Sequence, residues 1–241
     1  MNMRILFSIK CFIGGDQRYF NMRLGTVVPN FKAQTTKGPI KFYDWQGSSW
    51  VVIFSHPADF TPVCTTELGR IAVHQPEFEK RNCKVLAHSV DQLNAHVDWV
   101  NDIKSYCFDI PGDFPYPIIA DPTRDLAVQF EMLSEDEKNN AEAAKTIRAL
   151  YIISPDHKVH LSMFYPMSTG RNVDEILRCI DSIQLTERLK VIATPSNWYP
   201  GMKVMILPEV SDEEAQRLFP GSVSTVTLPS GSTYIRTTNK Y

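Results

Sequence analysis

The stretch 50-WVVIFSHPADFTPVC-64 decides the fold. Its first part, Trp50–Ser55, is almost continuously apolar, which is typical of a strand covered on both faces. Thr61 and Pro62 then favour a helix start, as N-cap and first helical residue. The stretch therefore predicts a buried strand, a short loop and a helix in which Cys64 is the third residue.

The rest of the chain continues this alternation of strands and helices. Helical spacing runs from Cys64 to Lys80 and again over 93–106, where Val97, Val100 and Ile103 are expected on the apolar face. Apolar runs predict strands at 84–90, 117–120, 147–154 and 159–164, and amphipathic spacing predicts helices at 123–132 and 172–189. This order predicts an α/β fold, a mixed sheet flanked by helices.

Three segments are expected along the chain. Residues 22–189 carry the alternating pattern and form the main domain. Residues 190–241 are punctuated by prolines and have too little apolar surface for a core of their own, so we expect a small C-terminal domain or arm that packs on the main body or on a second copy. Residues 1–21 are treated as an N-terminal extension outside the fold.

The role of the extension stays open between three alternatives. It carries Arg4, Lys10 and Arg18 against the single Asp16 and has scattered apolar residues, as a mitochondrial presequence does. A secretory signal fits less well, because Lys10 interrupts the apolar run. Met22 can also serve as the start, which makes the segment optional. We expect a cytoplasmic protein, or a mitochondrial one if the extension is a transit peptide.

Composition excludes several classes of function. The formal net charge is -2, with 43% hydrophobic and 22% charged residues, so no basic surface for nucleic acid is expected. No stretch approaches the roughly 18 apolar residues that span a bilayer. The five cysteines form no Cys-x-x-Cys pair, and His157 and His160 have a spacing that points to opposite faces of a strand. We expect no metal site and a reducing compartment.

Cys64 is the candidate reactive residue. At the third position of a helix its sulfur lies among backbone N–H groups that have no helical partner, at the positive end of the helix dipole, which favours a thiolate. A small buried cysteine that merely starts a helix fits this placement equally well. Placement alone does not decide between the two.

The residue pattern around Cys64 adds a family resemblance. Pro57, Thr61 and Cys64 form the pattern Pro-x-x-x-Thr-x-x-Cys, and the longer run Phe54–Glu67 resembles the peroxiredoxins of the single-cysteine, peroxiredoxin-6 type. The resemblance extends from about Arg23 to the C-terminus and includes the runs 168–172 and 228–231. It implies a thioredoxin-like fold and the reduction of hydrogen peroxide and organic hydroperoxides, lipid hydroperoxides included, without haem, flavin or metal.

The resemblance also implies roles for individual residues. Cys64 would be the nucleophile, Thr61 would hydrogen-bond the peroxide, and Pro57 would shield the pocket. Arg148 matches the family's distant arginine, and an arginine that leads into an apolar strand is costly unless it meets an anion. Two residues are expected near the substrate pocket without a fixed role: Arg171 and His56.

The other cysteines bear on how the enzyme is reset. Cys83 and Cys179 are expected in the core, and Cys107 is the one candidate for an internal resolving thiol. The resemblance implies that peroxide converts Cys64 to a sulfenic acid, and that two-cysteine peroxiredoxins carry a resolving cysteine in a C-terminal Val-Cys-Pro context. No cysteine follows Cys179 in this sequence, so an external thiol is expected to reduce the sulfenic acid, and over-oxidation is an expected liability. The resemblance suggests glutathione, with a glutathione transferase as a candidate partner. We also expect a homodimer.

Two alternatives accompany this reading. Some members of this branch are also phospholipases that use serine, histidine and aspartate; Ser49 and Asp156 match, but Tyr43 stands where the histidine is expected, and a phenol is a poor base at neutral pH. The other alternative is a redox-sensing or chaperone-like protein, which would need a reactive thiol but not Thr61 and Arg148.

Overall fold

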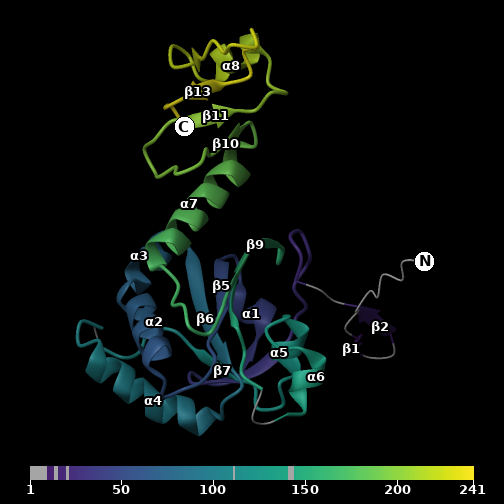
Figure 1. Ribbon diagram of the computed structural model, residues 1–241, viewed down its shortest axis with the longest axis vertical. Helices are drawn as coiled ribbons and strands as arrows, with labels where there is room; N and C mark the ends of the chain where they lie inside the picture. Colours follow the sequence, from purple (N-terminus) through teal and green to yellow (C-terminus); the bar gives the residue numbers. More distant parts are fainter. Residues whose placement is uncertain (1–9, 14–15, 20–21, 111, 141–143) are drawn as a thin grey trace. The chain divides into compact units, whose positions relative to one another are not determined.

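The computed structural model describes residues 10–13, 16–19, 22–110, 112–140 and 144–241 (Figure 1). They belong to two compact units, Met1–Val173 and Asp174–Tyr241. The division falls at the start of a helix that the sequence places in the main domain, and the boundary at 189/190 stays a prediction. In the extension, β1 (Lys10–Ile13) pairs antiparallel with β2 (Asp16–Tyr19). Its targeting role stays a prediction, because most of residues 1–21 lie outside the described residues.

A mixed sheet forms the centre of the first unit. Its strand order is β4-β3-β7-β6-β5-β8-β9, and the neighbours β5, β6 and β7 run parallel while the other pairings are antiparallel. The strands are β3 (Lys32–Thr35), β4 (Ile40–Lys41), β5 (Trp50–Ser55), β6 (Cys83–Ser89), β7 (Ile118–Ala120), β8 (Arg148–Ile153) and β9 (Val159–Tyr165). The predicted mixed sheet, with the buried strand at Trp50–Ser55, is confirmed.

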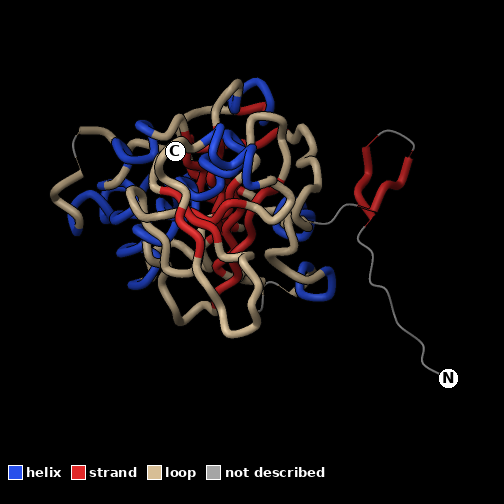
Figure 2. Tube along the Cα trace, turned by 90° about the horizontal axis from the view of Figure 1, so that it is seen from above, coloured by secondary structure: helices blue, strands red, loops and turns tan. Residues whose placement is uncertain are grey.

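Helices cover both faces of this sheet (Figures 1 and 2). They are α1 (Phe42–Gln46), α2 (Pro62–Val73), α3 (Gln75–Lys80), α4 (Leu93–Tyr106), α5 (Asp125–Gln129) and α6 (Glu135–Lys138). Alternate residues of β5 serve the two faces: Val51 and Ile53 join Phe42 of α1 in one cluster, whereas Phe54 points to the other face and meets Tyr116. The helices α2 and α4 pack together. The Phe54 face is the one that α2 covers, because the hydroxyl of Tyr116 donates to the carbonyl of Leu68 in α2.

The single helix predicted from Cys64 to Lys80 is wrong. The structure has α2 and α3, which meet at His74, a residue with φ -89° and ψ 7°. Pro76 explains the break, because proline has no N–H to donate and its ring clashes with the carbonyl four residues earlier in a continuous helix. Pro76 instead lies in the first turn of α3, where a missing donor costs nothing.

The buried face of α4 also differs from the prediction. The bounds Leu93–Tyr106 are as predicted, but Val97 is 50% exposed, and the buried residues are His96, Trp99 and Ile103. The apolar pattern excluded His96 because histidine counts as polar. Its ring is buried nonetheless, because both of its nitrogens have hydrogen-bond partners inside the protein.

The second unit has its own small sheet and core. The helix α7 (Val173–Leu189) begins at the division and is followed by a four-stranded antiparallel sheet of order β10-β11-β13-β12 and by α8 (Asp212–Leu218). The strands are β10 (Ile192–Ala193), β11 (Val204–Ile206), β12 (Ser224–Thr225) and β13 (Arg236–Thr238). A buried cluster surrounds Trp198, so the expectation that this tail lacks a core is wrong. Leu185 of α7 contributes to that cluster.

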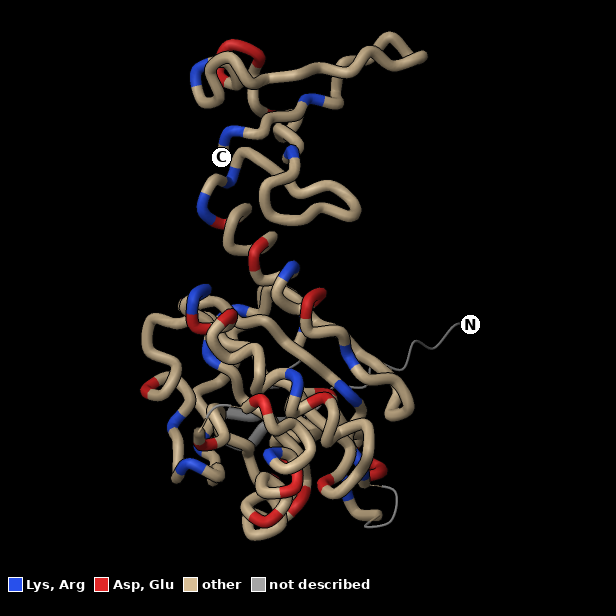
Figure 3. Tube along the Cα trace, turned by 90° about the vertical axis from the view of Figure 1, so that its left-hand side faces the viewer, with Lys and Arg blue, Asp and Glu red and all other residues tan. Residues whose placement is uncertain are grey.

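Charges are mixed along both units. Figure 3 shows Lys and Arg interspersed with Asp and Glu along the trace, as the near-neutral net charge of -2 suggests. Of the helices that the structure describes, none is long and apolar enough to cross a membrane.

Candidate active site

Cys64 lies at the carboxyl end of β5, one loop beyond the strand. Thr61 is the N-cap of α2 with extended backbone (φ -117°, ψ 145°), Pro62 is the first helical residue, and Cys64 is therefore the third, as predicted. The Cys64 side chain is fully buried. Open α/β sheets place ligand sites at this end of their strands, next to helix N-termini that favour negative charge.

Arg148 reaches Cys64 from the neighbouring strand. The antiparallel register pairs Phe54 of β5 with Leu150 of β8, so Arg148, the first residue of β8, comes alongside the end of β5. Its Nη1 lies 3.4 Å from Sγ of Cys64, and its Nε donates to the carbonyl of Met167 at 2.9 Å. The guanidinium is buried, with 2% exposure. A fixed, buried positive charge beside the sulfur favours a thiolate and charge that develops on a substrate.

Glu67 links this arginine to Arg171. Its Oε2 accepts from Nη1 of Arg148 at 3.1 Å and from Nη2 of Arg171 at 2.5 Å, and its Oε1 accepts from Nε of Arg171 at 2.7 Å. Burial alone would raise the pKa of Glu67, but the hydrogen bonds and charge of Arg171, with the charge of Arg148, hold this pKa below its ordinary value. Two guanidinium groups and one carboxylate leave a net positive charge, which an anion at Cys64 would neutralise.

Glu67 is a site residue that the sequence-based prediction did not include. A signal was present, because Glu67 follows Cys64 by one helical turn and two buried arginines require a carboxylate nearby. Arg171 is further fixed by two backbone carbonyls, those of Ala149 at 2.6 Å and Ser55 at 2.8 Å. Arg171 therefore contacts Glu67 and the strand ends, and reaches Cys64 only through this network of hydrogen bonds.

Thr61 and Pro57 lie in the loop before α2. The hydroxyl of Thr61 donates to the carbonyl of Ala58 at 2.8 Å, so the predicted N-cap residue makes no side-chain cap bond to the helix. Its oxygen keeps lone pairs with which it can accept a further hydrogen bond. Pro57 is buried. The structure thus brings Cys64, Thr61, Pro57 and Arg148 into one region of the first unit.

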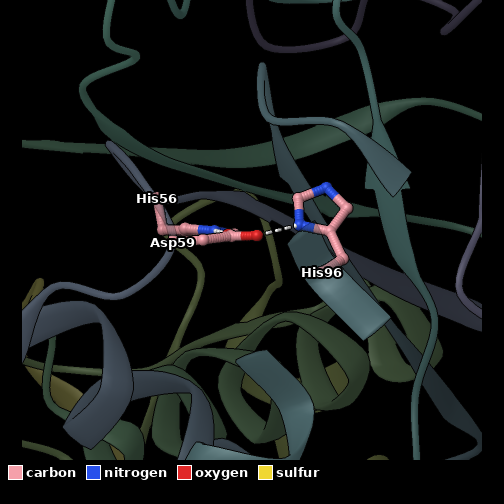
Figure 4. A group of neighbouring side chains, drawn as sticks. All are labelled: His56, Asp59 and His96. Carbon is pink, nitrogen blue, oxygen red and sulfur yellow. Dashed lines mark hydrogen bonds and ion pairs between the residues drawn. The ribbon is translucent and has the colours of Figure 1, made fainter. Parts of the chain in front are cut away.

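His56 belongs to a separate buried cluster with Asp59 and His96 (Figure 4). Nε2 of His56 lies 2.8 Å from one carboxylate oxygen of Asp59, and Nδ1 of His96 lies 2.6 Å from the other. One ligand atom from each residue lies within 4.8 Å of the others, a grouping that could hold a metal ion. Sequence spacing missed this cluster, because His96 follows Asp59 by 37 positions and comes from α4.

Cys83, Cys107 and Cys179 are buried and unbridged. Burial raises the pKa of Cys83 to about 12 and, together with Glu175, raises that of Cys179 to about 11. Burial also raises the pKa of Cys107. A Cβ placed on Gly69 would lie 2.2 Å from Sγ of Cys107, which puts that thiol against α2 more than one turn beyond Cys64. These thiols are poor nucleophiles at neutral pH.

The three residues of the phospholipase alternative, Ser49, Tyr43 and Asp156, are bonded to other groups. Ser49 donates to the side-chain oxygen of Asn82 at 2.9 Å, and the hydroxyl of Tyr43 donates to a backbone carbonyl at 2.7 Å. Asp156 is paired with Lys158 at 2.6 Å. Burial raises the pKa of Tyr43, which makes this phenol a still poorer base. The three side chains are therefore bonded to other groups, and within the described residues no hydrogen bond or ion pair joins them into a catalytic triad.

Comparison with known proteins agrees with this geometry. Residues 24–162 match the AhpC/TSA family, and residues 182–221 match the C-terminal domain of 1-Cys peroxiredoxin. Peroxiredoxin-6 of Gallus gallus is 52% identical over 216 residues, which cover 89% of this chain and 96% of the relative, and peroxiredoxin-6 of Homo sapiens is 50% identical over the same shares. The chain belongs to the 1-Cys peroxiredoxins of the peroxiredoxin-6 type.

Solved structures support the same assignment for this peroxiredoxin. A cysteine-to-serine mutant of peroxiredoxin 6 of Arenicola marina has 50% sequence identity and a TM-score of 0.84, covering 91% of this chain and 98% of its own. The mitochondrial 1-Cys peroxiredoxin of yeast has 42% identity and a TM-score of 0.81, covering 90% and 99%, and its thiol is resolved via glutathione/thioredoxin systems. This peroxiredoxin is a thiol-dependent peroxidase that acts on hydroperoxides and needs no prosthetic group.

Proposed function

We propose that Cys64 is the nucleophile of this peroxidase. The observation that carries the proposal is the distance of 3.4 Å from Nη1 of Arg148 to the buried Sγ of Cys64. The thiolate attacks one peroxide oxygen, an S–O bond forms while the O–O bond breaks, and the departing oxygen takes up a proton to leave as water or an alcohol. Cys64 is left as sulfenic acid.

The surrounding residues stabilise the charge that moves during this step. We assign to Arg148 the stabilisation of the thiolate and of the peroxide oxygens, and to Thr61 a hydrogen bond to the peroxide. Pro57 shields the sulfur from water. Arg171 acts through Glu67, whose Oε2 accepts from the same nitrogen of Arg148, Nη1, that faces the sulfur and so holds the guanidinium in place. We assign His56 to the wall of the substrate pocket. It follows β5 directly, and its Nε2 lies 2.8 Å from Asp59 of this loop.

An external thiol is proposed to reset the enzyme, with glutathione as the reductant. Cys83, Cys107 and Cys179 are buried, and burial raises the pKa of each, so these three thiols are poorly suited to attack a sulfenic acid. Resolution through glutathione or thioredoxin in the yeast relative favours the same class of reductant. Because Cys64 is buried, a glutathione transferase that delivers the thiol is a candidate partner.

Assembly and location are proposed from the sequence. We propose a homodimer, whose mass a light-scattering measurement would give directly. We also propose a cytoplasmic location for a chain that starts at Met22, and a mitochondrial one where residues 1–21 act as a transit peptide. Fluorescent fusions of residues 1–241 and 22–241 distinguish the two: different locations would assign targeting to the extension, and one shared cytoplasmic location would make it optional.

The direct test of the proposed site compares hydroperoxide consumption by the wild type and by Cys64→Ser. Glutathione and a simple dithiol are supplied in separate assays, so that a failure with glutathione alone identifies a wrong reductant and not a wrong site. Cys107→Ser is the matched control, because it removes another buried thiol that lies against α2. We expect turnover in Cys107→Ser and none in Cys64→Ser; turnover in Cys64→Ser would overturn the proposal.

A further inference from the structure

The hydrogen bonds of His56, Asp59 and His96 require three ring N–H groups, whereas two neutral histidines would supply only two. Nε2 of His96 lies 3.1 Å from the carbonyl of Ile119, and a carbonyl can only accept, so Nε2 carries a hydrogen. Nδ1 of the same ring lies 2.6 Å from Oδ2 of Asp59. If Asp59 is ionised, Nδ1 also carries a hydrogen, and His96 is an imidazolium ion.

The state of Asp59 follows from its surroundings. Burial would raise the pKa of Asp59, but its hydrogen bonds with His56 and His96 outweigh burial and keep this pKa below its ordinary value. Asp59 is therefore a carboxylate, and the shared proton resides on His96. A buried carboxylate without that proton would be an uncompensated charge, which is strongly unfavourable.

His56 is in a different state from His96. Its Nε2 faces the carboxylate of Asp59 at 2.8 Å and so carries a hydrogen, whereas its buried Nδ1 has no hydrogen-bond partner among the described residues. Burial lowers the pKa of His56 and the hydrogen bond and charge of Asp59 only partly oppose this effect; the charges of His96 and Asp91 act in addition. His56 is neutral, with a lone pair on Nδ1.

These distances are those of hydrogen bonds and not of ligands around a metal ion. Ligand atoms at 2.0–2.1 Å from a tetrahedral zinc ion lie about 3.3 Å apart. The two nitrogen–oxygen distances of the cluster, 2.8 and 2.6 Å, are shorter. A chain of one neutral imidazole, one carboxylate and one imidazolium therefore accounts for the geometry without an ion.

The hydrogen-bonded chain of His56, Asp59 and His96 is anchored in the loop between β5 and α2, which carries Pro57 and Thr61. Asp59 is held at three points: by the two histidine rings and by Asp91, which accepts from its backbone N–H at 3.0 Å. The next residue, Phe60, has φ 54°, a left-handed conformation that a bulky side chain adopts only when its surroundings enforce it. Thr61 follows directly.

We propose that Asp59 and His96 are positioning residues of the peroxidase, which hold the β5–α2 loop in its strained form through a chain that retains one proton. The three hydrogen bonds of Asp59 fix the backbone at Phe60, and that backbone sets the direction of Thr61 and of the first turn of α2. The same helix α4 supports this turn a second time, because Nε1 of Trp99 donates to Oγ1 of Thr65 at 3.1 Å. The inference rests on the proposed role of Cys64.

A spectroscopic measurement tests the protonation pattern. Proton–nitrogen correlation spectra of the histidine rings in the reduced wild type should show two protonated nitrogens for His96 and one for His56. In Asp59→Asn the side chain keeps its shape but can donate to Nδ1 of His96, so His96 should show a single protonated nitrogen. A wild-type His96 with one unprotonated nitrogen would overturn the assignment, as would an imidazolium that survives in Asp59→Asn.

A kinetic measurement tests the positioning role. We expect the rate of Cys64 oxidation by hydrogen peroxide to fall about 10- to 100-fold in Asp59→Asn and in His96→Gln, the loss that a small misplacement causes. His88→Gln is the matched control, since His88 is also fully buried and pairs with a carboxylate, Asp121, at 3.1 Å. His88→Gln should keep its rate within about twofold.

The outcomes separate this inference from the proposed function. An equal loss in His88→Gln would mean that any buried histidine has this effect, and wild-type rates in Asp59→Asn and His96→Gln would mean that the chain positions nothing; either result overturns the inference alone. Full peroxidase activity in Cys64→Ser would instead overturn the proposed site. The spectra are read without turnover and remain valid in both cases.

Discussion

Nη1 of Arg148 lies 3.4 Å from Sγ of Cys64, although 84 positions separate the two residues in the sequence. The pairing of β8 with β5 brings them together, and both side chains are buried. Because water is excluded, the guanidinium charge acts on the sulfur with little screening. The peroxidase site therefore depends on one strand pairing and one helix start.

Replacing Arg148 should reduce the rate of peroxide reduction far more than it reduces stability. In Arg148→Met we expect a rate about 10²–10³-fold lower, the loss typical of a removed charge-stabilising donor, while Glu67 keeps its bonds to Arg171. Stopped-flow measurement of Cys64 oxidation gives the rate. The control is Arg70→Met, which removes a 56% exposed arginine of α2, the helix that carries Cys64. Similar rates in the two variants would contradict the role of Arg148.

Glu67→Gln should destabilise the protein in a pH-dependent manner. Removing one partner of a buried ion pair costs about 3–5 kcal/mol, and here two arginines lose their counter-charge. The folded pKa of Glu67 is lowered, so its contribution is present above the unfolded value of about 4.3 and is lost as the pH falls through the folded pKa. In urea unfolding, the gap between wild type and Glu67→Gln should be full at neutral pH and shrink below about pH 4.

The control for Glu67 is Glu77→Gln on α3. Glu77 also has a lowered pKa, caused by its hydrogen bonds with Lys80 and Arg81, but it lies at the surface. Solvent and salt screen such pairs, so its unfolding midpoint should match the wild type. A gap for Glu67→Gln that is constant at every pH would show that the Glu67 charge does not contribute as described.

Gly69→Ala should be destabilising, although alanine is the better helix former. In the interior of α2 this change would normally add about 1 kcal/mol of stability. The new Cβ would lie 2.2 Å from Sγ of Cys107, and such overpacking costs about 1–3 kcal/mol. Chemical denaturation of Gly69→Ala, Cys107→Ala and the double variant forms a cycle, in which loss of the sulfur should recover part of the stability. Additive effects would place Cys107 away from α2.

Thr61→Val should lower the peroxidase rate, whereas Thr61→Ser should retain most of it. The hydroxyl donates to the carbonyl of Ala58 and keeps lone pairs free for the substrate. Valine has the shape of threonine without the hydroxyl, and serine keeps the hydroxyl without the methyl group. Initial rates at several hydroperoxide concentrations compare the two. If Thr61→Val matched Thr61→Ser, the hydroxyl would have no role in the reaction.

The sequence predicts the elements with strong periodicity and misses the weak ones. The strand β5 and the helix α4 have the predicted bounds, because a continuous apolar run and a long amphipathic stretch are unambiguous. The short strand β3 escaped prediction, since only one of its residues is buried and its pattern is not apolar. The break before α3 depended on Pro76, whose clash with the preceding turn outweighs the helical spacing.

For the site, local chemistry could be predicted and long-range pairing could not. Thr61, Pro62 and Cys64 follow from helix-start rules within one stretch. The pairing of Arg148 with Cys64 came from the family resemblance, because no local rule joins residues so far apart. Helical spacing places Glu67 one turn after Cys64, but its pairing with Arg148 and Arg171 depends on the packing of β8 against α2. The buried state of His96 depends on its bond to Asp59, which no local pattern indicates.

The most direct test of this account is the mass of the protein after one equivalent of hydrogen peroxide, without added thiol. A single nucleophile predicts one added oxygen, placed by peptide mapping on Cys64 and removed by glutathione or a dithiol. A loss of two hydrogens with Cys64 joined to Cys107, or an oxygen on another cysteine, would contradict it.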